Sequence, residues 1–239
     1  MVIVHSSDLH VGDDYATRLW GGDDVRALRA VLSTARIVGA DVVLLAGDVF
    51  EHNRLPGDVL DRSGELLANA GMPVVILPGN HDPVVAGSVY HRSAIGRLLD
   101  VHVFGVTDDE SVILGGLDLE VWGHAHRDYD DMVPLRKPRP RSTRWQIAMA
   151  HGHYQSMPDR SIVKRPAWLI GKDEIAATGA DYLALGHWNR PARVGNGRVP
   201  AYYSGSPEFA GTVNVVRLTA EYPVRVRRRR IPWRAAPAP

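Results

Sequence analysis

Cysteine is absent from this sequence of 239 residues, and lysine is scarce, with 3 residues against 25 arginines. The lack of cysteine excludes disulfides, zinc-thiolate sites and thiol nucleophiles. No apolar run approaches the roughly 20 residues that a helix needs to cross a bilayer, so no membrane-spanning helix is expected. The chain opens on an apolar strand pattern rather than a cationic leader, which predicts no signal peptide and a cytoplasmic location.

Charge is almost balanced over the whole chain but is unevenly distributed along it. The net charge is +1, yet residues 1–120 contain 8 arginines and 18 acidic residues, whereas residues 121–239 contain 20 basic and 9 acidic residues. One interpretation is a cation site in the first half beside an anion-binding surface in the second. The other is a set of solvated charges on unrelated faces.

The first half alternates between strand patterns and helix patterns. The stretches "MVIVHSSDLH", "ADVVLLAGDVF" and "MPVVILPGNHD" each contain a buried strand pattern followed by polar side chains. Apolar residues recur at helical spacing over 25–38 and 59–70, and Gly71 is a plausible helix stop. This alternation predicts a mostly parallel sheet covered by helices.

The second half is richer in short strands with glycine-rich turns, which predicts a second, partly antiparallel sheet. Residues 173–178 are its clearest helix, and the proline-rich stretch 134–144 is expected to be a loop. With 45% hydrophobic residues, the chain is long enough for a sizeable core, and we expect one domain over 1–239. That domain would include a basic strand and short tail from about 221 to 239.

Potential metal ligands follow five of the predicted strands. Because ligands of open α/β sheets gather beyond the carboxyl ends of strands, we expect these side chains to converge. Oxygen and imidazole donors without thiolate suit manganese, iron or zinc. The residues are Asp8, His10, Asp48, Asn80, His81, His151 and His187.

The order of these motifs resembles that of the calcineurin-like metallophosphoesterase superfamily: Asp-x-His, Gly-Asp, Gly-Asn-His-Asp, a histidine, then Gly-His-x-His. Within it, "HSSDLHVG", "LPGNHDP", "LGHWNRP" and "YYSGSPEF" look most like the nuclease domain of SbcD-type DNA repair exonucleases. The resemblance implies a four-layer α/β/β/α sandwich of two mixed sheets flanked by helices. It also implies phosphodiester hydrolysis by a metal-activated water at a dinuclear centre, most simply with two Mn²⁺ ions.

The same resemblance implies a role for each motif. Asp8 and His10 would bind the first metal, and Asp48 would bridge the two ions. The second metal would be bound by Asn80, His151 and His187. His81 would act as the catalytic residue beside the metals, by donating a proton to the leaving group or a hydrogen bond to a phosphoryl oxygen.

Two stretches compete for the last motif, "GHAH" at His124 and His126 and "GHWN" at His187 and Asn189. The family order favours the second, so His124 and His126 receive no ligand role. We expect them to be an exposed loop pair, with contact to the substrate as the alternative. Asn189 then stands where histidine is usual, and its neutral amide oxygen predicts weaker binding of the first metal.

Three further residues near the motifs are left with open roles. His153 is a possible substitute ligand or a substrate contact. Glu51 and His52 follow Asp48 closely, and they either take a secondary role at the site or belong to a polar loop.

Several substrates are compatible with this site. Basic clusters in "RKPRPRSTR" and "VRVRRRRIPWR" are consistent with DNA, although arginines also keep an edge strand soluble. The alternatives are a small-molecule phosphodiesterase or phosphomonoesterase, and a catalytically weak metal-binding interaction protein. The sequence identifies no protein partner or oligomeric state.

Overall fold

Two six-stranded mixed sheets form the centre of the protein. The computed structural model describes residues 1–239 except 20, 130–132, 136–137, 159–167, 223 and 234–239. The first sheet contains, in spatial order, β14 (Arg225–Arg230), β13 (Thr212–Arg217), β1 (Val2–Ser6), β2 (Val42–Ala46), β3 (Val74–Leu77) and β4 (Val101–Val103). The second contains β11 (Ala192–Val194), β12 (Ala201–Tyr203), β10 (Tyr182–Gly186), β7 (Trp145–His151), β6 (Leu119–Gly123) and β5 (Ser111–Leu114).

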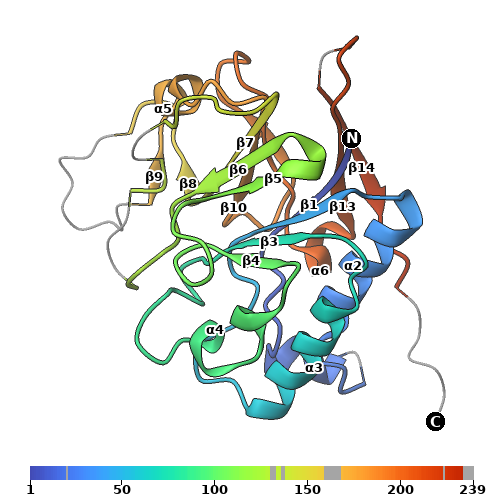
Figure 1. Cartoon of the computed structure of the whole chain (residues 1–239). Coiled ribbons are helices and arrows are strands. Elements are labelled where there is room, and N and C mark those ends of the chain that lie inside the picture. The colour runs from blue at the N-terminus through green and yellow to red at the C-terminus, as the bar shows by residue number, and fades with distance from the viewer. Residues whose placement is uncertain (20, 130–132, 136–137, 159–167, 223, 234–239) are drawn as a thin grey trace.

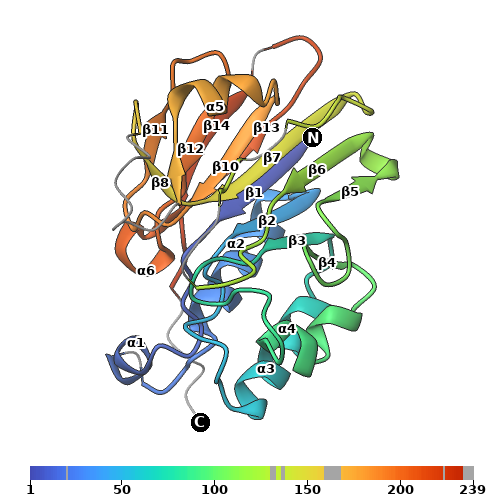
Figure 2. The same ribbon diagram turned by 90° about the vertical axis from the view of Figure 1, so that its left-hand side faces the viewer.

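Helices cover the outer faces of this pair of sheets. The helices of the described residues are α1 (Asp14–Leu19), α2 (Arg26–Val38), α3 (Gly57–Ala68), α4 (Val89–Arg92), α5 (Lys172–Ala177) and α6 (Pro207–Ala210), with 3₁₀ turns η1 (Ile95–Arg97) and η2 (Gly115–Leu117). Of these, α1 buries no residue and does not cover a sheet. A small ladder joins β8 (His153–Tyr154) to β9 (Leu169–Ile170). Figures 1 and 2 show α2, α3 and α4 beside the first sheet and α5 beside the second, which confirms the predicted four layers.

Parallel strands bring their carboxyl ends to one edge of each sheet. In the first sheet β1, β2, β3 and β4 run parallel, and β13 is antiparallel to β1. In the second, β6, β7, β10 and β12 run parallel, with β5 and β11 as antiparallel edges. The loops that follow β1, β2, β3, β7 and β10 can therefore meet at a common edge.

The core has one apolar layer on each side of each sheet. Helix α2 shows how the sequence produces it, because Leu28, Val31, Leu32 and Ala35 recur at helical spacing and are fully buried. The helix ends at Gly39, whose left-handed conformation lets its N–H reach the last carbonyl groups. A second layer lies between the sheets and a third lies outside the second sheet around Ile175 of α5.

The secondary-structure predictions largely hold. The predicted helices over 25–38, 59–70 and 173–178 correspond to α2, α3 and α5, and β14 is the predicted basic strand. The described residues of 134–144 contain no helix or strand, whereas 136–137 and the tail 234–239 lie outside the described residues. No helix in the described part of the chain has the length and apolarity needed to cross a membrane. The single-domain organisation remains a prediction.

Candidate metal centre

The two sheets touch where β2 and β10 end, and the predicted ligands gather there. Gly186, the last residue of β10, lies so close to β2 that a Cβ would overlap the Ala46 carbonyl oxygen. Gly47, the residue that follows Ala46, has φ +90°, and a Cβ there would overlap the His151 ring. Glycine at both positions lets side chains of one sheet reach backbone of the other.

Backbone strain is concentrated at this edge. Five non-glycine residues in the described part of the chain have positive φ, and four of them are predicted ligands: Asp8 (55°), His10 (48°), Asp48 (52°) and His187 (102°). Such conformations cost free energy and persist where the surrounding structure enforces them, often at functional sites. The strain is therefore independent support for a site at these four residues.

The predicted donors form two overlapping clusters. The ligand atoms of Asp8, His10 and Asp48 lie within 4.8 Å of one another, and so do those of Asp48, His151 and His187. Asp48 belongs to both clusters, which is the arrangement that a bridging carboxylate requires. The Asn80 Oδ1 joins the second cluster, at 3.0 Å from His151 Nε2 and 3.2 Å from His187 Nδ1.

The two buried carboxylates of the clusters attract positive charge. Asp8 and Asp48 are each 2% exposed. Burial, with a contribution from Asp48, raises the pKa of Asp8. Burial opposes protonation of His151, but Asp48 and Asp8 outweigh it and raise its pKa to about 9. Divalent cations would supply this positive charge without a proton, so the donor set fits a metal centre.

Hydrogen bonds orient the second cluster. The Nδ1–H of His151 donates to the Ala46 carbonyl oxygen at 2.9 Å, which leaves Nε2 3.1 Å from Asp48 Oδ2. The backbone N–H of His187 donates to the Asp8 carboxylate at 3.0 Å. A ligand histidine whose other nitrogen is engaged, as in His151, keeps one tautomer and one ring orientation.

His81 lies beside the first cluster. Its ring packs edge-on against His10, with centroids 4.7 Å apart, and its side chain is 38% exposed. Its backbone N–H donates to Asp48 Oδ1 at 2.9 Å, and its Nδ1–H donates to the Glu51 carbonyl oxygen at 2.9 Å. Nε2 is then the ring nitrogen left for a substrate.

Glu51 and His52 separate in the structure. The Glu51 carboxylate lies 2.7 Å from His10 Nδ1 and 3.7 Å from His81 Nδ1, so Glu51 belongs to the site. His52 is exposed, and its Nδ1 accepts a hydrogen bond from the Arg54 N–H at 3.3 Å. Of the two interpretations left open for this pair, the site role fits Glu51 and the polar loop fits His52.

Asp82 is a supporting residue to which sequence reasoning assigned no role. This fully buried carboxylate accepts hydrogen bonds from the N–H groups of Gly79 and Val49 at 2.7 and 2.9 Å and from the Tyr90 hydroxyl at 2.6 Å. It therefore ties the loop after β2 to the loop after β3. Its place in the "GNHD" motif was the available signal.

The expectation for the "GHAH" stretch was wrong. His124 is 6% exposed and His126 is fully buried, rather than forming an exposed loop pair. The Nε2–H of His126 donates to the His151 carbonyl oxygen at 3.0 Å, and His124 Nδ1 lies 3.0 Å from the Glu110 carboxylate. Both come shortly after β6, and the His126 ring packs against the rings of His151 and Trp168, with centroids 5.6 Å from each.

Asn189 and His153 lie at the surface near His187. Asn189 is exposed, and its backbone carbonyl accepts a hydrogen bond from the Ser206 N–H at 3.2 Å. His153 is also exposed, and its Nδ1 accepts a hydrogen bond from the Trp188 indole at 3.0 Å. The roles of Asn189 as a ligand and of His153 as a substitute remain predictions.

Comparison with known proteins agrees with this geometry. The model of the calcineurin-like phosphoesterase family matches residues 1–191. The chain is 26% identical to the SbcD subunit of the SbcCD nuclease of Bacillus subtilis over 242 residues, covering 87% of this chain and 61% of that protein. It is 27% identical to the DNA double-strand break repair protein Mre11 of Aeropyrum pernix over 227 residues, covering 85% and 52%. The chain thus spans little more than half of each relative's length.

A solved structure gives the same result for the fold. The protein TT1561 of Thermus thermophilus superposes with a TM-score of 0.59 at 15% identity, covering 95% of this chain and 98% of that one. The family match covers the residues of the five metal-ligand motifs, in the loops after β1, β2, β3, β7 and β10. This chain therefore belongs to the calcineurin-like phosphoesterase family, whose members are metal-dependent phosphoester hydrolases.

Proposed function

We propose that this chain hydrolyses phosphodiester bonds at a dinuclear metal centre. The observation that carries the proposal is the pair of donor clusters that share Asp48. Asp8 and His10 would hold the first ion and Asn80, His151 and His187 the second, with Mn²⁺ the best match to these oxygen and imidazole donors. When bound, two divalent ions generate a nucleophile from water near neutral pH and stabilise charge on the phosphoryl oxygens.

His81 is the proposed catalytic residue of the chain itself. Its Nδ1–H is held by the Glu51 carbonyl oxygen, so Nε2 is the atom left for the leaving oxygen, and the imidazolium form would donate its Nε2 proton there and become neutral. The exposed fraction of its side chain, 38%, leaves it accessible to a substrate. The ring of His81 packs against the His10 ring, beside the cluster of Asp8, His10 and Asp48.

Substitution of His81 tests this role. In Mn²⁺-loaded protein with bis-p-nitrophenyl phosphate, His81→Ala should retain its bound metal but lose about 10²- to 10⁴-fold in turnover. His52→Ala is the matched control, because His52 is a nearby exposed histidine whose Nδ1 accepts a hydrogen bond from the Arg54 N–H. Unchanged turnover of His81→Ala would remove His81 from the mechanism.

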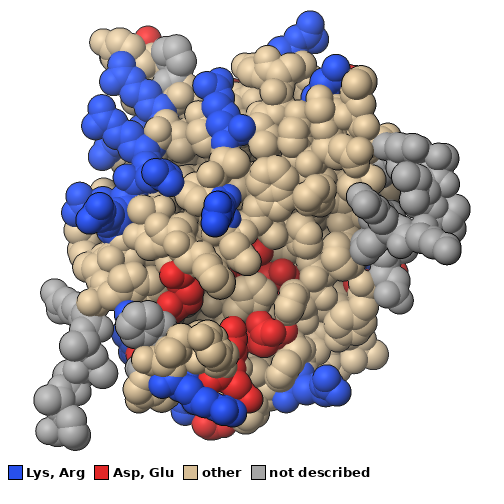
Figure 3. Space-filling view, turned by 180° about the vertical axis from the view of Figure 1, so that it is seen from behind, with Lys and Arg blue, Asp and Glu red and all other residues tan. Residues whose placement is uncertain are grey.

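DNA is the proposed substrate class, and β14 supports it. β14 is the outer strand of the first sheet, and its arginines are exposed. Figure 3 shows Lys and Arg along one side of the molecule, with Asp and Glu gathered elsewhere on the same face. Alternate residues of a strand lie about 7 Å apart, so the row presents repeating positive charge to a phosphate backbone.

The second basic cluster supports DNA binding less well. In the loop 134–144, Arg139 pairs with Glu120 at 3.1 Å, and Arg141 pairs with Asp181 at 2.7 Å. By contrast, no ion pair with a carboxylate is found for the β14 arginines in the described part of the chain. Paired arginines have less charge to offer a phosphate, so β14 is the more suitable surface.

Binding of single-stranded DNA tests the role of β14. Replacing Arg225, Arg227 and Arg229 with Gln should reduce the slope of log K against log salt by about 2, since each lost phosphate contact contributes about 0.7. Replacing Arg144, Arg193 and Arg198, which are exposed on β11 or in loops beside the second sheet, gives the same change in net charge and should alter the slope less. Equal slopes in both triple variants would remove β14 as a DNA surface.

The small-molecule alternative predicts a different substrate profile. The Mn²⁺-loaded protein can be compared on bis-p-nitrophenyl phosphate, p-nitrophenyl phosphate, a cyclic nucleotide, and single- and double-stranded DNA. Rapid turnover of the diester with neither DNA cleaved would favour a small-molecule phosphodiesterase. Turnover of the monoester alone would favour a phosphomonoesterase.

A further inference from the structure

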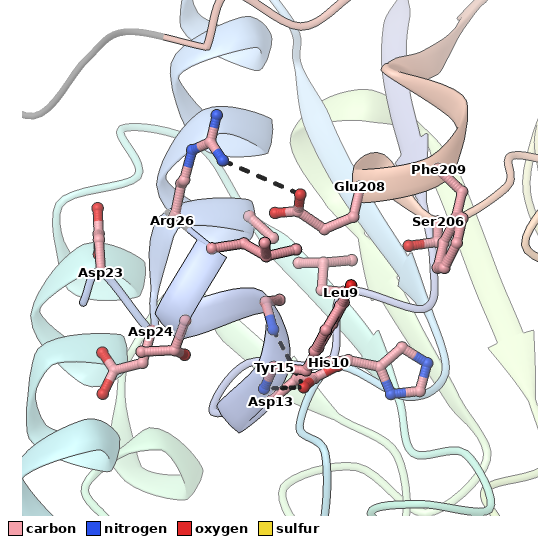
Figure 4. A pocket seen from close by; sticks show the side chains of 14 residues that line it. Leu9, His10, Asp13, Tyr15, Asp23, Asp24, Arg26, Ser206, Glu208 and Phe209 are labelled. Carbon is pink, nitrogen blue, oxygen red and sulfur yellow. Dashed lines mark hydrogen bonds and ion pairs between the residues drawn. The ribbon is translucent and has the colours of Figure 1, made fainter. Parts of the chain in front are cut away.

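A pocket of about 190 Å³ opens beside His10, between α1, the start of α2 and α6. Leu9, Ala16 and Ala27 contribute apolar lining. Tyr15, Phe209 and Leu19 also line it and are 74%, 77% and 59% exposed, so three large apolar side chains gather at one solvent-accessible place. Figure 4 shows the pocket, with the Arg26–Glu208 pair and the His10 ring on opposite sides of the lining side chains.

The charged residues of the pocket already have partners within the protein. Asp13 accepts hydrogen bonds from the N–H groups of Tyr15 and Ala16 at 2.7 and 3.3 Å. The remaining carboxylates form ion pairs: Asp23 with Arg29 at 3.2 Å, Asp24 with Arg62 at 2.7 Å and Glu208 with Arg26 at 4.0 Å. Arg26 also lies 4.1 Å from the centroid of the Trp233 ring. These pairings leave the pocket better suited to an uncharged aromatic ring than to an isolated ion.

We infer that this pocket binds the nucleobase adjacent to the scissile phosphate, an inference that rests on the proposed phosphodiesterase function. His10 lies in the wall of the pocket and also in the donor cluster with Asp8 and Asp48. If the scissile phosphate binds at these donors, the His10 side chain alone separates it from the pocket. A group attached to the phosphorus can therefore extend into the pocket. The volume is below the roughly 300–1,000 Å³ of pockets for drug-sized ligands, so it suits one ring system.

Tyr15 and Phe209 would supply the stacking surface. Every base has a π face, so stacking on aromatic side chains accepts any base. The pocket therefore favours nucleoside esters over simple alkyl esters, whichever base they carry. The pocket thus acts on substrate choice, separately from the metal ligands. It also gives the exposed aromatic side chains of α1 and α6 a function.

Two diesters with the same leaving group isolate the contribution of the pocket. One is the p-nitrophenyl ester of thymidine monophosphate, and the other is methyl p-nitrophenyl phosphate. The wild-type protein should have the higher kcat/KM for the nucleoside ester. Phe209→Ala and Tyr15→Ala should each lower the ratio of the two kcat/KM values by about tenfold, and Ala16→Trp, which fills the pocket, should abolish the preference.

The matched control is Leu99→Ala, which removes a large apolar side chain that is 95% exposed and lies outside this pocket. Its ratio should equal that of the wild-type protein. Circular dichroism of each variant checks that the fold is retained. Ratios that stay at the wild-type value in folded Phe209→Ala, Tyr15→Ala and Ala16→Trp would overturn the inference.

Ring binding without turnover separates this inference from the proposed function. Saturation-transfer NMR of adenosine with metal-free protein should show transfer to the base protons, and the signal should fall in Phe209→Ala and Ala16→Trp. Failure of the Mn²⁺-loaded protein to hydrolyse either diester would overturn the proposed function, while the NMR result still tests the pocket. Equal transfer in wild-type and variant proteins would overturn the pocket.

Discussion

The two Gly-His stretches occupy equivalent positions in the second sheet and yet have different surroundings. β6 and β10 lie on either side of β7 and run parallel to it, so "GHAH" and "GHWN" both emerge beside His151. The rings of His126 and His187 lie 5.6 and 5.3 Å from the His151 ring. Only His187 is in a cluster with Asp48, whereas His126 binds the backbone of His151.

The contact with the first sheet accounts for this difference. The end of β10 packs against the Ala46 carbonyl, and the His187 N–H binds the Asp8 carboxylate. The end of β6 instead lies near the end of β3, where the His126 N–H donates to the Pro78 carbonyl oxygen at 3.2 Å. A perfect local motif is therefore not a metal site unless its strand meets the carboxylates of the opposite sheet.

Substitution of the two histidines should give the largest contrast. His187→Ala should lose one bound ion and reduce diester turnover by roughly 10²- to 10³-fold, because charge stabilisation at the phosphoryl group is lost. His126→Ala should keep both ions and lose at most about tenfold, the lower end of the effect of outer partners of metal ligands. Elemental analysis and steady-state kinetics measure both, and equal metal loss in the two variants would contradict the distinction.

Acidification should weaken the contact that holds β10 against β1. His5 is fully buried between the sheets, with Nδ1 2.8 Å from the Tyr182 hydroxyl oxygen. Burial lowers the pKa of His5 from 6.5 to about 3. The unfolded chain then binds a proton that the folded protein excludes, so stability is complete above pH 6.5 and falls as the pH drops toward 3.

The size of this effect follows from the linkage of protonation to folding. Metal-free wild-type protein should lose about 2 kcal/mol more of its unfolding free energy between pH 6.5 and about pH 4.5 than His5→Gln does, at about 1.4 kcal/mol per pH unit. Urea unfolding of the two proteins in a chelator measures the difference. If the unfolding free energies of the two proteins fall equally with pH, protonation of His5 does not contribute to the loss of stability in acid.

Restoring the usual histidine in the "GHWN" stretch should give the smallest change. Asn189→His should raise the affinity for the first Mn²⁺ ion by about tenfold, because an imidazole nitrogen is a better donor than an amide oxygen. Calorimetric titration with Mn²⁺ measures this affinity, and Asn189→Ala is the control. Identical first-site affinities in all three proteins would exclude Asn189 as a ligand. Two ions tightly bound to the wild-type protein at trace metal would instead contradict the weaker binding of the first ion.

The fold could be predicted because its periodic signals are strong and local. The helix pattern of Leu28, Val31, Leu32 and Ala35 and the apolar runs of β1, β2 and β3 needed no tertiary information. The burial of His124 and His126 could not be predicted in this way. It depends on which loops cover the end of β6, and no periodic pattern reports that.

The sequence by itself determined which residue types end each central strand, and therefore the donor chemistry and the family. The tertiary structure alone decided which of these side chains meet, because the contacts span long separations of sequence. His151 binds the Ala46 carbonyl across 105 residues, and His187 reaches Asn80 across 107 and Asp8 across 179. Packing of one sheet against the other sets those contacts, and it explains why the imperfect Gly-His stretch, rather than the perfect one, lies at the proposed metal centre.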